Sequence, residues 1–299
     1  MAGMELRAPL IGRKGDVAYS RIESSTSART LHTGGHPGRW SKLYSRLWPL
    51  LLAILFVLVI WQGVYFSGWK PSYVLPSPAA VGQQILTMLG EPRFWQAVAT
   101  TMTRALIGFG VAVSLGTALG IAVSRFRIVK AAVGSLLTGL QTMPSIAWFP
   151  FAILLFGLTE QAILFVVVLG AAPSVANGLI SGIGDVSPHL IRAARTMGAR
   201  GVSLYRFIVL PAALPAYLSG LNQGWAFAWR SLMAGELLVI IASRPSLGVQ
   251  LAYYRDFANA PALVASMIFI LVIGMVVDGV FSRISNAARV RRGLGAVSR

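Results

Sequence analysis

The chain has 299 residues, of which 56% are hydrophobic and only 12% are charged, and its mean hydropathy is +0.69. Water-soluble domains carry about 25% charged residues, so this composition excludes an ordinary soluble globule and predicts a membrane protein. There are 26 Lys and Arg residues against 9 Asp and Glu, which gives a formal charge of +17. The chain contains no cysteine, which excludes disulfides, thiol catalysis and thiolate metal sites.

Residues 1–47 form a polar segment that is rich in Ser, Gly, Thr and Arg, with 8 basic and 3 acidic residues and no apolar period. This composition predicts a disordered basic tail. The first apolar run begins only at Trp48, whereas a cleavable signal peptide has its apolar core within roughly the first 15 to 30 residues. We therefore expect a membrane span at Trp48 and not a signal peptide.

Six uncharged runs follow, and each reaches the length of about 18 residues that a spanning helix needs. We place the spans at about 48–66, 105–124, 131–157, 161–184, 210–241 and 257–280. These runs do not alternate between apolar and polar residues, as the strands of a membrane β-barrel do. The sequence therefore predicts an all-α membrane protein with a transmembrane domain over residues 48–284 and a basic tail over residues 285–299.

The basic residues are unevenly distributed over the loops. If the N-terminus is cytoplasmic, 20 of the 26 basic residues lie in cytoplasmic segments, 5 lie outside, and Arg230 falls within a span. Cytoplasmic loops carry an excess of Lys and Arg, so both termini are predicted to be cytoplasmic. A nucleic-acid site would need the same charges on one folded face. Their distribution over alternate loops instead indicates that they set the orientation of the chain in the membrane.

Small residues recur every four positions within three spans, a spacing that lets helix backbones approach closely. The three strips, which we expect to pack helix against helix within the subunit or across a dimer, are Gly108, Ala112, Gly116 and Gly120; Gly178 and Gly182; and Gly220 and Gly224.

The loop over residues 185–206 is longer than a simple helix connection, and its pattern predicts two short helices. Ser187 is a good N-cap, Pro188 suits the first helical position, and Gly198 suits a left-handed C-terminal end. The second helix is predicted to start at Ser203. The apolar face of the first helix consists of Leu190, Ala194 and Met197. An amphipathic element on anionic lipid and a helix that docks into another protein both fit this pattern.

The run IRAARTMGARGVSLYRFIVLP, residues 191–211, resembles the EAA loop of ABC-importer permeases. In that loop an Ala-Ala pair, a Gly-Ala four residues on and a later Leu-Pro form a coupling helix, which fits a cleft in the ATPase subunit. The matching positions are Ala193, Ala194, Gly198, Ala199, Leu210 and Pro211, and Met197 lies among them. The opening Glu of the motif is Arg192 here, so a salt bridge from that Glu is not expected.

The resemblance extends over about residues 48–289. The segments LPSPAAV (75–81), FWQAVATTMTRALIGF (94–109), QTMPSIAWFPFAILLFG (141–157) and GEL around Glu236 resemble the nitrate, sulfonate and taurine branch of these permeases, and most of all aliphatic sulfonate permeases. The resemblance implies a type I importer-like fold of six spans. It also implies a second permease copy, two ATPase subunits and an extracytoplasmic substrate-binding protein as partners.

The sequence contains no GxxxxGK[ST] phosphate-binding loop, so the chain is not expected to be the ATPase itself. ATP would be bound by the partner subunits, and we expect no cofactor in this chain. The three histidines, at positions 32, 36 and 189, have no spacing that would hold a metal.

Polar residues within the spans are candidates for the translocation pathway, because ionisable groups at membrane depth are costly and usually functional. At 100° per residue, four residues of the fifth span fall within about 60° and should face the dimer axis or a water-filled cavity. They are Asn222, Trp225, Trp229 and Glu236. Arg230 lies about 240° from Glu236, so it needs a partner elsewhere or an anionic substrate.

The third span contributes Gln141, Pro144 and Trp148 as pathway candidates, since Pro144 and Pro150 interrupt a long apolar run as in helices that line a cavity. Asn177 of the fourth span is a further candidate. Other interpretations stay open at this stage: the tryptophans can serve packing or an interfacial belt, Glu236 can be a satisfied interhelical group, and the prolines can serve shape alone.

Together these features predict the permease subunit of an ATP-driven importer that moves a small oxyanion, such as an alkanesulfonate, taurine or nitrate, by alternating access. One alternative is an ion-gradient-driven transporter or channel, for which Glu236 would be the available carboxylate. A second alternative, an intramembrane enzyme, lacks a paired-acid, Ser-His or metal constellation in the spans.

Overall fold

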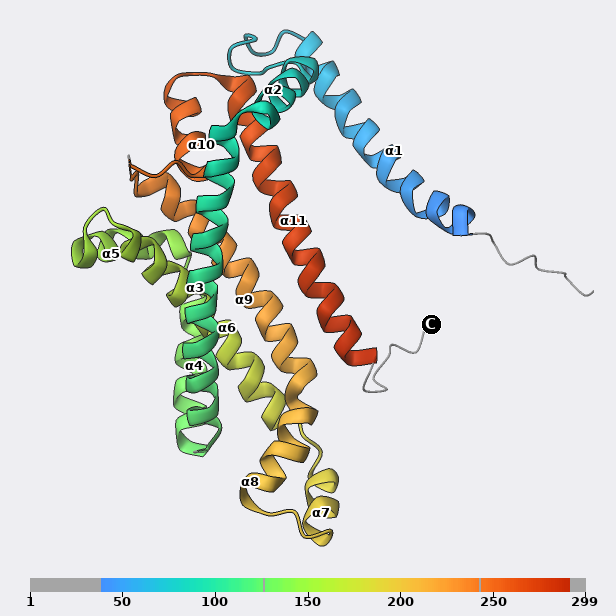
Figure 1. Cartoon of the computed structure of the whole chain (residues 1–299), viewed down its shortest axis with the longest axis vertical. Coiled ribbons are helices and arrows are strands. Elements are labelled where there is room, and N and C mark those ends of the chain that lie inside the picture. Colours follow the sequence, from blue (N-terminus) through green and yellow to red (C-terminus); the bar gives the residue numbers. More distant parts are fainter. Residues whose placement is uncertain (1–38, 126, 242, 291–299) are drawn as a thin grey trace, which may run out of the picture. The chain divides into compact units, whose positions relative to one another are not determined.

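The computed structural model describes residues 39–125, 127–241 and 243–290, and every regular element within them is a helix (Figure 1). The helices are α1 (Arg39–Phe66), α2 (Pro78–Gly90), α3 (Pro92–Arg125), α4 (Arg127–Thr142), the 3₁₀ turn η1 (Ser145–Trp148), α5 (Phe149–Phe156), α6 (Glu160–Gly184), α7 (Pro188–Thr196), α8 (Gly201–Leu204), the π-helical turn η2 (Tyr205–Val209), α9 (Leu210–Leu238), α10 (Leu247–Asp256) and α11 (Ala260–Val290). The all-α fold class predicted from the sequence is confirmed.

The chain divides into two units, residues 1–54 and 55–299, and the boundary falls within α1. In the first unit α1 begins at Arg39, inside the segment predicted to be a tail, while residues 1–38 lie outside the described residues. Every side chain of α1 from Trp48 to Ile60 is exposed, and most of them are apolar. An exposed apolar helix surface of this kind suits lipid.

Five helical segments of the described residues are long and apolar enough to cross a membrane, and a bent helix pair raises the number to as many as six. The five are Trp48–Phe66, Pro92–Ser124, Glu160–Gly184, Gly201–Leu238 and Ala260–Ala287. The second, fourth and fifth of these are clearly longer than the spans predicted from hydropathy. The helix α3 begins 13 residues before Ala105, and α11 continues into the predicted C-terminal tail, of which residues 291–299 lie outside the described residues.

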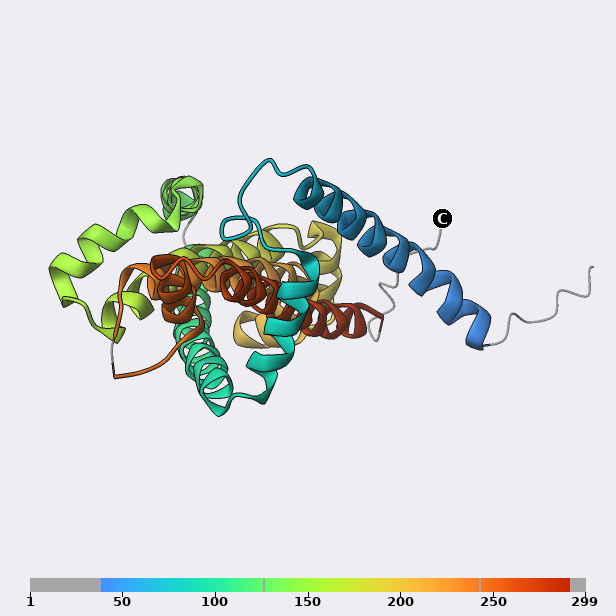
Figure 2. The same cartoon turned by 90° about the horizontal axis from the view of Figure 1, so that it is seen from above.

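The bent pair occupies the residues of the third predicted span, 131–157. Its two parts, Val133–Thr142 and Ser145–Phe156, meet at an angle of 100°. Pro144 lies at the break with an extended ψ of 127°, and Pro150 lies in the first turn of α5. A proline disfavours helical geometry in the residue before it and cannot continue the hydrogen-bond ladder, which explains why the helix ends here. Figure 2 looks almost down the axis of α4, with α5 running sideways from it.

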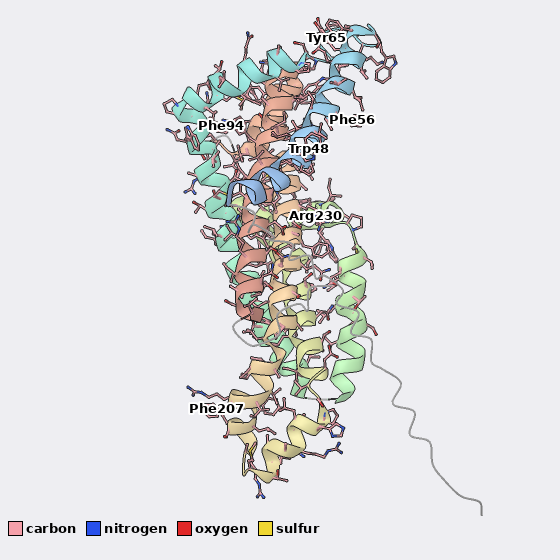
Figure 3. All side chains as sticks on the ribbon, turned by 90° about the vertical axis from the view of Figure 1, so that its right-hand side faces the viewer. Trp48, Phe56, Tyr65, Phe94, Phe207 and Arg230 are labelled. Carbon is pink, nitrogen blue, oxygen red and sulfur yellow. The ribbon has the colours of Figure 1, made fainter. Side chains whose placement is uncertain are left out.

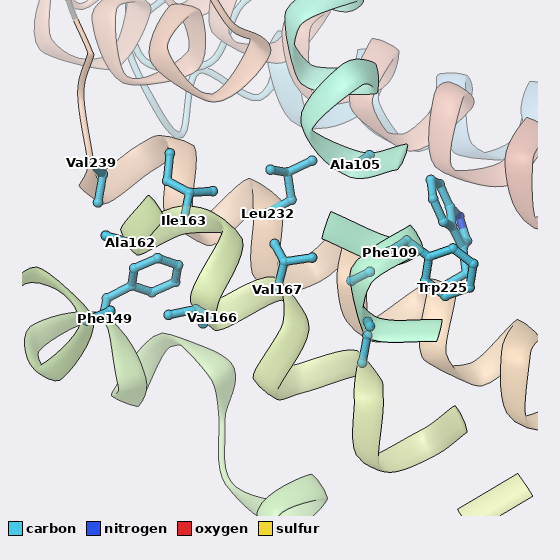
Figure 4. Packing of buried hydrophobic residues seen from close by; sticks show 14 residues of the cluster. Ala105, Phe109, Phe149, Ala162, Ile163, Val166, Val167, Trp225, Leu232 and Val239 are labelled. Atoms are coloured by element: carbon cyan, nitrogen blue, oxygen red, sulfur yellow. The ribbon is translucent and has the colours of Figure 1, made fainter. Parts of the chain in front are cut away.

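The core of the second unit is built on α6, which packs against both α3 and α9. Ala162, Ile163, Val166 and Val167 on α6 are fully buried, as Figure 4 shows for the region around Phe149 and Leu232. The small-residue strips produce this close packing. A Cβ added at Gly116 would lie 2.6 Å from the Ala172 carbonyl oxygen, and one added at Gly178 would lie 2.7 Å from the Gly220 Cα.

The predicted role of the glycine strips in helix packing within the subunit is thus confirmed. The elements α2 and α10 lie at one end of the second unit, and the short helices α7 and α8 lie at the other end (Figure 1). We call these the α10 end and the α7 end.

Candidate translocation pathway and coupling loop

Glu236 lies in the last turn of α9 and is fully buried. Its carboxylate accepts hydrogen bonds from the Thr101 hydroxyl (Oγ1 to Oε2, 2.9 Å), the Arg104 guanidinium (Nη1 to Oε1, 3.0 Å) and the Gly248 backbone N–H (N to Oε2, 3.1 Å). The expectation that Glu236 faces the dimer axis or a water-filled cavity is therefore wrong. A buried carboxylate is tolerated here because a cation and neutral donors bind it. This agrees with the other interpretation of Glu236, as a group whose hydrogen bonds are satisfied by neighbouring helices.

Arg104 connects Glu236 to a second acid. The hydropathy pattern places Arg104 in a loop before the second span, but it is a buried residue of α3, only 4% exposed. Its other terminal nitrogen contacts Glu160 (Nη2 to Oε1, 3.0 Å), and Arg244 contacts the same oxygen (Nη1 to Oε1, 3.1 Å). We call the series Glu236–Arg104–Glu160–Arg244 the ion-pair chain. The two negative charges of its glutamates equal the two positive charges of its arginines.

Sequence reasoning missed the ion-pair chain because its central pair, Arg104 and Glu236, is separated by 132 positions. The sequence signal that could have revealed the ion-pair chain was the Glu236 carboxylate within a predicted span. A buried acid in a span needs a base from another helix, and Arg104 stands at the edge of an apolar run, where a long side chain can reach inward.

Trp225 and Trp229 are part of an aromatic cluster. Trp225 is 1% exposed, and its ring packs edge-on against Phe109 at 5.3 Å and nearly parallel to Phe281 at 5.4 Å between ring centroids. Trp229 stacks on Trp225 at 6.3 Å and remains half-buried. Figure 4 shows Trp225 lying against Phe109. The packing interpretation therefore holds for Trp225, whose ring joins α3, α9 and α11.

Arg230 has an exposed side chain, and Figure 3 shows it between the two ends of the second unit, which Phe94 and Phe207 mark. Its Nε donates to the Ala226 carbonyl oxygen of the preceding turn (2.9 Å), and its guanidinium carbon lies 4.9 Å from the centroid of the Phe227 ring. None of the ion pairs formed by the described residues includes Arg230. The expectation that Arg230 and Glu236 are not paired is confirmed.

Two pockets share Arg230. The smaller, of about 270 Å³, lies at the break between α4 and η1, where α6 and α9 face it. Gln141, Pro144 and Trp148 line it together with Arg230, so four of the predicted pathway residues meet there. None of the described residues that line it carries a carboxylate. The Gln141 amide donates to Ser174 Oγ (3.2 Å), which ties the end of α4 to α6.

The larger pocket, of about 550 Å³, lies between α9, α10 and α11. Trp225, Trp229 and Arg230 line it from α9, while Leu251 of α10 and Asp278 of α11 line it from the other helices. Arg230 thus lies between an acid-free pocket and one that holds a carboxylate.

Asn177 lies elsewhere, in a polar groove of about 550 Å³ between α6 and α9. Ser181, Ser219 and Gln223 line the groove with it, alongside the glycines at the crossing of the two helices. Asn222 is half-buried on α9, and its Oδ1 is a buried atom without a hydrogen-bond partner among the described residues. The groove gives the crossing of α6 and α9 a partly polar face.

The loop at the α7 end has the caps that the sequence predicts. The Ser187 side chain accepts a hydrogen bond from the His189 N–H (3.3 Å), Pro188 opens α7, and Gly198 follows the helix with a φ of +89°. The second helix begins at Gly201 (φ +54°) and not at Ser203. The reason is that the left-handed backbone at Gly201 already turns the chain, so the helix can form two residues earlier.

The predicted apolar face of α7 is divided. Ala194 is 1% exposed and packs with Val186, Leu204 and Val209 inside the loop. Met197 is 79% exposed, and Leu190 is 43% exposed. The expectation that Ala194 shares a docking face with these residues is therefore wrong, because α8 folds back and covers it. The other residues that match the EAA loop are exposed or half-buried, as is Arg192, which replaces its opening Glu: Ala193, Gly198, Ala199, Leu210 and Pro211.

Comparison with known proteins places these features in a family. Residues 110–290 match the family described as "Binding-protein-dependent transport system inner membrane component". The chain belongs to this family. The permease is 28% identical over 246 residues to the taurine transport system permease protein TauC of Escherichia coli, covering 80% of this chain and 88% of that one. It is 29% identical over 235 residues to the putative aliphatic sulfonates transport permease protein SsuC of the same organism, covering 77% and 88%.

Among solved structures, the permease is similar to a chain of the MetNI methionine ABC transporter crystallised in an inward-facing conformation. The TM-score is 0.50 and the identity 22%, and the match covers 65% of this chain and 93% of that chain. This similarity shows the fold. The permease is accordingly a multi-pass inner membrane component of a binding-protein-dependent ABC importer, which is not catalytic itself and binds no cofactor, and such importers work with ATPase and binding-protein partners.

Proposed function

We propose that the permease imports a small oxyanion, such as an alkanesulfonate, taurine or nitrate, by alternating access. The observation that carries this proposal is Arg230, an exposed cation within a spanning helix that has no acidic partner among the described residues. Such a group is too costly to face lipid and belongs beside water or an anion. The similarity to taurine and aliphatic sulfonate permeases supports the same substrate class.

The geometry around Arg230 suits an oxyanion. Its Nε is already bound to Ala226 and its face lies near Phe227, which leaves the two terminal nitrogens to donate. Two parallel N–H groups match the oxygen spacing of a sulfonate or nitrate. The smaller pocket adds the polar side chains Gln141 and Ser145 beside the cation.

The α7 end is cytoplasmic in this proposal, and both termini lie on the same side. The exposed basic residues Arg192, Arg195, Arg200 and Arg206 cluster at the α7 end, as the positive-inside rule requires. The α10 end then faces the binding protein.

The loop at the α7 end would dock into the ATPase. Gly198 supplies a turn without a side chain, and Met197 projects beside it. The internal packing of Ala194 against Leu204 and Val209 makes the loop a rigid unit that continues into α9. A push on this unit would move α9, which carries Arg230.

A second permease copy would complete the pathway. The polar groove around Asn177 and Gln223 opens on the face of α6 and α9. In a bilayer such a face must be covered by protein or water and not by lipid. Two copies paired through this face would enclose a hydrophilic path, with one ATPase below each copy.

The ion-gradient alternative depends on a carboxylate that can exchange protons or ions. Glu236 was the candidate, but it is enclosed by Thr101, Arg104 and Gly248. A carboxylate already bound by a cation is a poor ion site, so the structure favours the ATP-driven importer.

The test is uptake by cells that express the complete transporter, with radiolabelled taurine, an alkanesulfonate and nitrate. Arg230→Ala should reduce uptake by a factor of about ten or more, the value expected when a charge-assisted hydrogen bond is lost. Arg230→Lys should retain part of the activity, because it keeps the charge. The matched control is Arg283→Ala, which removes an exposed arginine of α11.

Equal uptake by the wild type and Arg230→Ala would contradict the role of Arg230. Uptake of neutral solutes only would contradict the oxyanion assignment. Uptake that continues without ATPase subunits, driven by a gradient, would favour the secondary transporter.

A further inference from the structure

The start of α10 is bound to the ion-pair chain. The Leu247 N–H donates to Thr101 Oγ1 (3.0 Å), and the Gly248 N–H donates to Glu236 Oε2 (3.1 Å). The third amide, Val249 N–H, donates to the Ser246 side chain (3.4 Å). The first turn of a helix has N–H groups without partners inside the helix, and here the hydroxyl and carboxylate from α3 and α9 satisfy two of them.

Gly248 allows this contact because it lacks a side chain. A Cβ added at Gly248 would overlap the Glu236 Cβ and would lie 3.0 Å from the Glu236 carbonyl carbon. Two of the three nearest atoms belong to the α9 backbone, and the Glu236 Cβ is bonded directly to it, so none of them can rotate away. The N-terminus of α10 therefore packs in direct contact with the last turn of α9.

The ion-pair chain runs from this buried contact to the surface. The exposed fraction of the side chains rises from 0% at Glu236 and 5% at Arg104 to 33% at Glu160 and 64% at Arg244. Arg104 thus neutralises Glu236 where both side chains are buried, while Glu160 and Arg244 hold Arg104 from the exposed end of the ion-pair chain. The carboxylate remains available to hold α10.

The other contacts of α10 place it beside the larger of the two pockets lined by Arg230, which we call the Arg230 pocket. Leu251 lines the larger pocket together with Arg230, while Leu247 and Tyr254 pack into an apolar cluster with Phe94 and neighbouring residues of α2 and α11. Burial, with a smaller contribution from the nearby Glu91 carboxylate, raises the pKa of the Tyr254 phenol above its ordinary value. Leu247, Gly248 and Ala252 of α10 are buried, and the position of the helix determines one wall of the pocket.

We propose that Glu236 is a positioning residue for transport: it fixes the N-terminus of α10 to α9, so that α10 forms a wall of the Arg230 pocket and moves with α9. This inference rests on the proposed function only in treating that pocket as part of the pathway. Glu236 acts through Gly248 and Thr101 and does not contact the substrate.

The experiment compares four variants of the full transporter, reconstituted with its ATPase and binding protein in lipid nanodiscs and proteoliposomes. Glu236→Ala removes the acceptor, and Glu236→Gln keeps an acceptor but removes the charge. Gly248→Ala keeps Glu236 and displaces α10. The matched control is Gly82→Ala, because a Cβ added at Gly82 would meet no atom within 4 Å.

Amide hydrogen exchange at residues 247–249 is the first readout and does not depend on the substrate. Both Glu236→Ala and Gly248→Ala should accelerate it by about tenfold or more, with Glu236→Gln intermediate and Gly82→Ala unchanged. The same two variants should lose most of their uptake but keep ATP hydrolysis, as expected when α10 no longer follows α9. If Glu236→Ala fails to assemble, Gly248→Ala and Glu236→Gln still decide the question.

Wild-type uptake by Gly248→Ala, despite accelerated exchange, would overturn the proposal. So would a loss of uptake in Glu236→Ala and Glu236→Gln with unchanged exchange, which would mean that the carboxylate serves the pathway directly. If the wild type transports none of the oxyanions, the proposed substrate class fails, yet the exchange and hydrolysis results still test the role of Glu236.

Discussion

Thr101 shows how one hydroxyl can serve two helices. It donates to the Glu236 carboxylate and accepts from the Leu247 N–H, and it is fully buried. Both partners would lose a hydrogen bond if the hydroxyl were removed, and neither could turn to water. An unsatisfied buried group costs more than the bond itself contributes to stability.

We expect Thr101→Val to reduce the free energy of unfolding by about 1–3 kcal/mol. The measurement is the thermal denaturation midpoint of the purified permease in detergent. The control is Thr103→Val, because that exposed hydroxyl donates to the Ala99 carbonyl of its own helix (2.8 Å) and links no second helix within the described part of the chain. Equal midpoints for the two variants would show that the buried hydroxyl contributes no net stability.

At the scale of elements, the four-residue spacing of glycines predicts where helices touch, since small residues are what allow backbones to approach. The spacing cannot predict which helices are paired. The structure pairs Gly178 of α6 with Gly220 of α9, and Gly116 of α3 with Ala172 and Val175 of α6. The true start of α3 was likewise invisible to hydropathy, because Arg93 and Arg104 interrupt the apolar run although they continue the helix.

Gly178→Val should destabilise the crossing of α6 and α9, because its Cβ would lie 2.7 Å from the Gly220 Cα. Overpacking of this kind costs about 1–3 kcal/mol, or more where backbone is the obstacle. The readout is the yield of folded protein together with the denaturation midpoint. Gly110→Val on α3 is the control, as a Cβ added there meets nothing within 4 Å. Equal loss in both variants would mean that chain conformation, and not the crossing, is responsible.

At the scale of the whole molecule, the proposal requires that force enter at the α7 end and act on the pocket near Arg230. The loop is folded on its own core and runs without interruption through α8 and η2 into α9. This continuity provides a mechanical connection, whereas the alternative of a helix resting on lipid would not need a rigid attachment to a span.

Gly198→Glu should abolish co-purification with the ATPase while membrane insertion persists, because it adds charge and bulk to the proposed docking turn. The matched control is Gly68→Glu, which introduces the same residue at another left-handed glycine (φ +67° against +89°) outside the α7–α8 loop. Affinity purification through a tag on the ATPase measures the difference. Full recovery of the Gly198→Glu permease with the ATPase would contradict the docking turn.

The sequence alone determined the features that depend on composition and local geometry. Apolar runs of spanning length, the proline break at Pro144 and the Ser187 and Gly198 caps follow from residues close together in the chain. The tertiary structure alone decided the environment of the polar residues. Glu236 binds Arg104 and does not face water, and Ala194 packs against Leu204 and does not face a partner. Both outcomes depend on other helices, because the environment of a helical face is defined only by what packs against it.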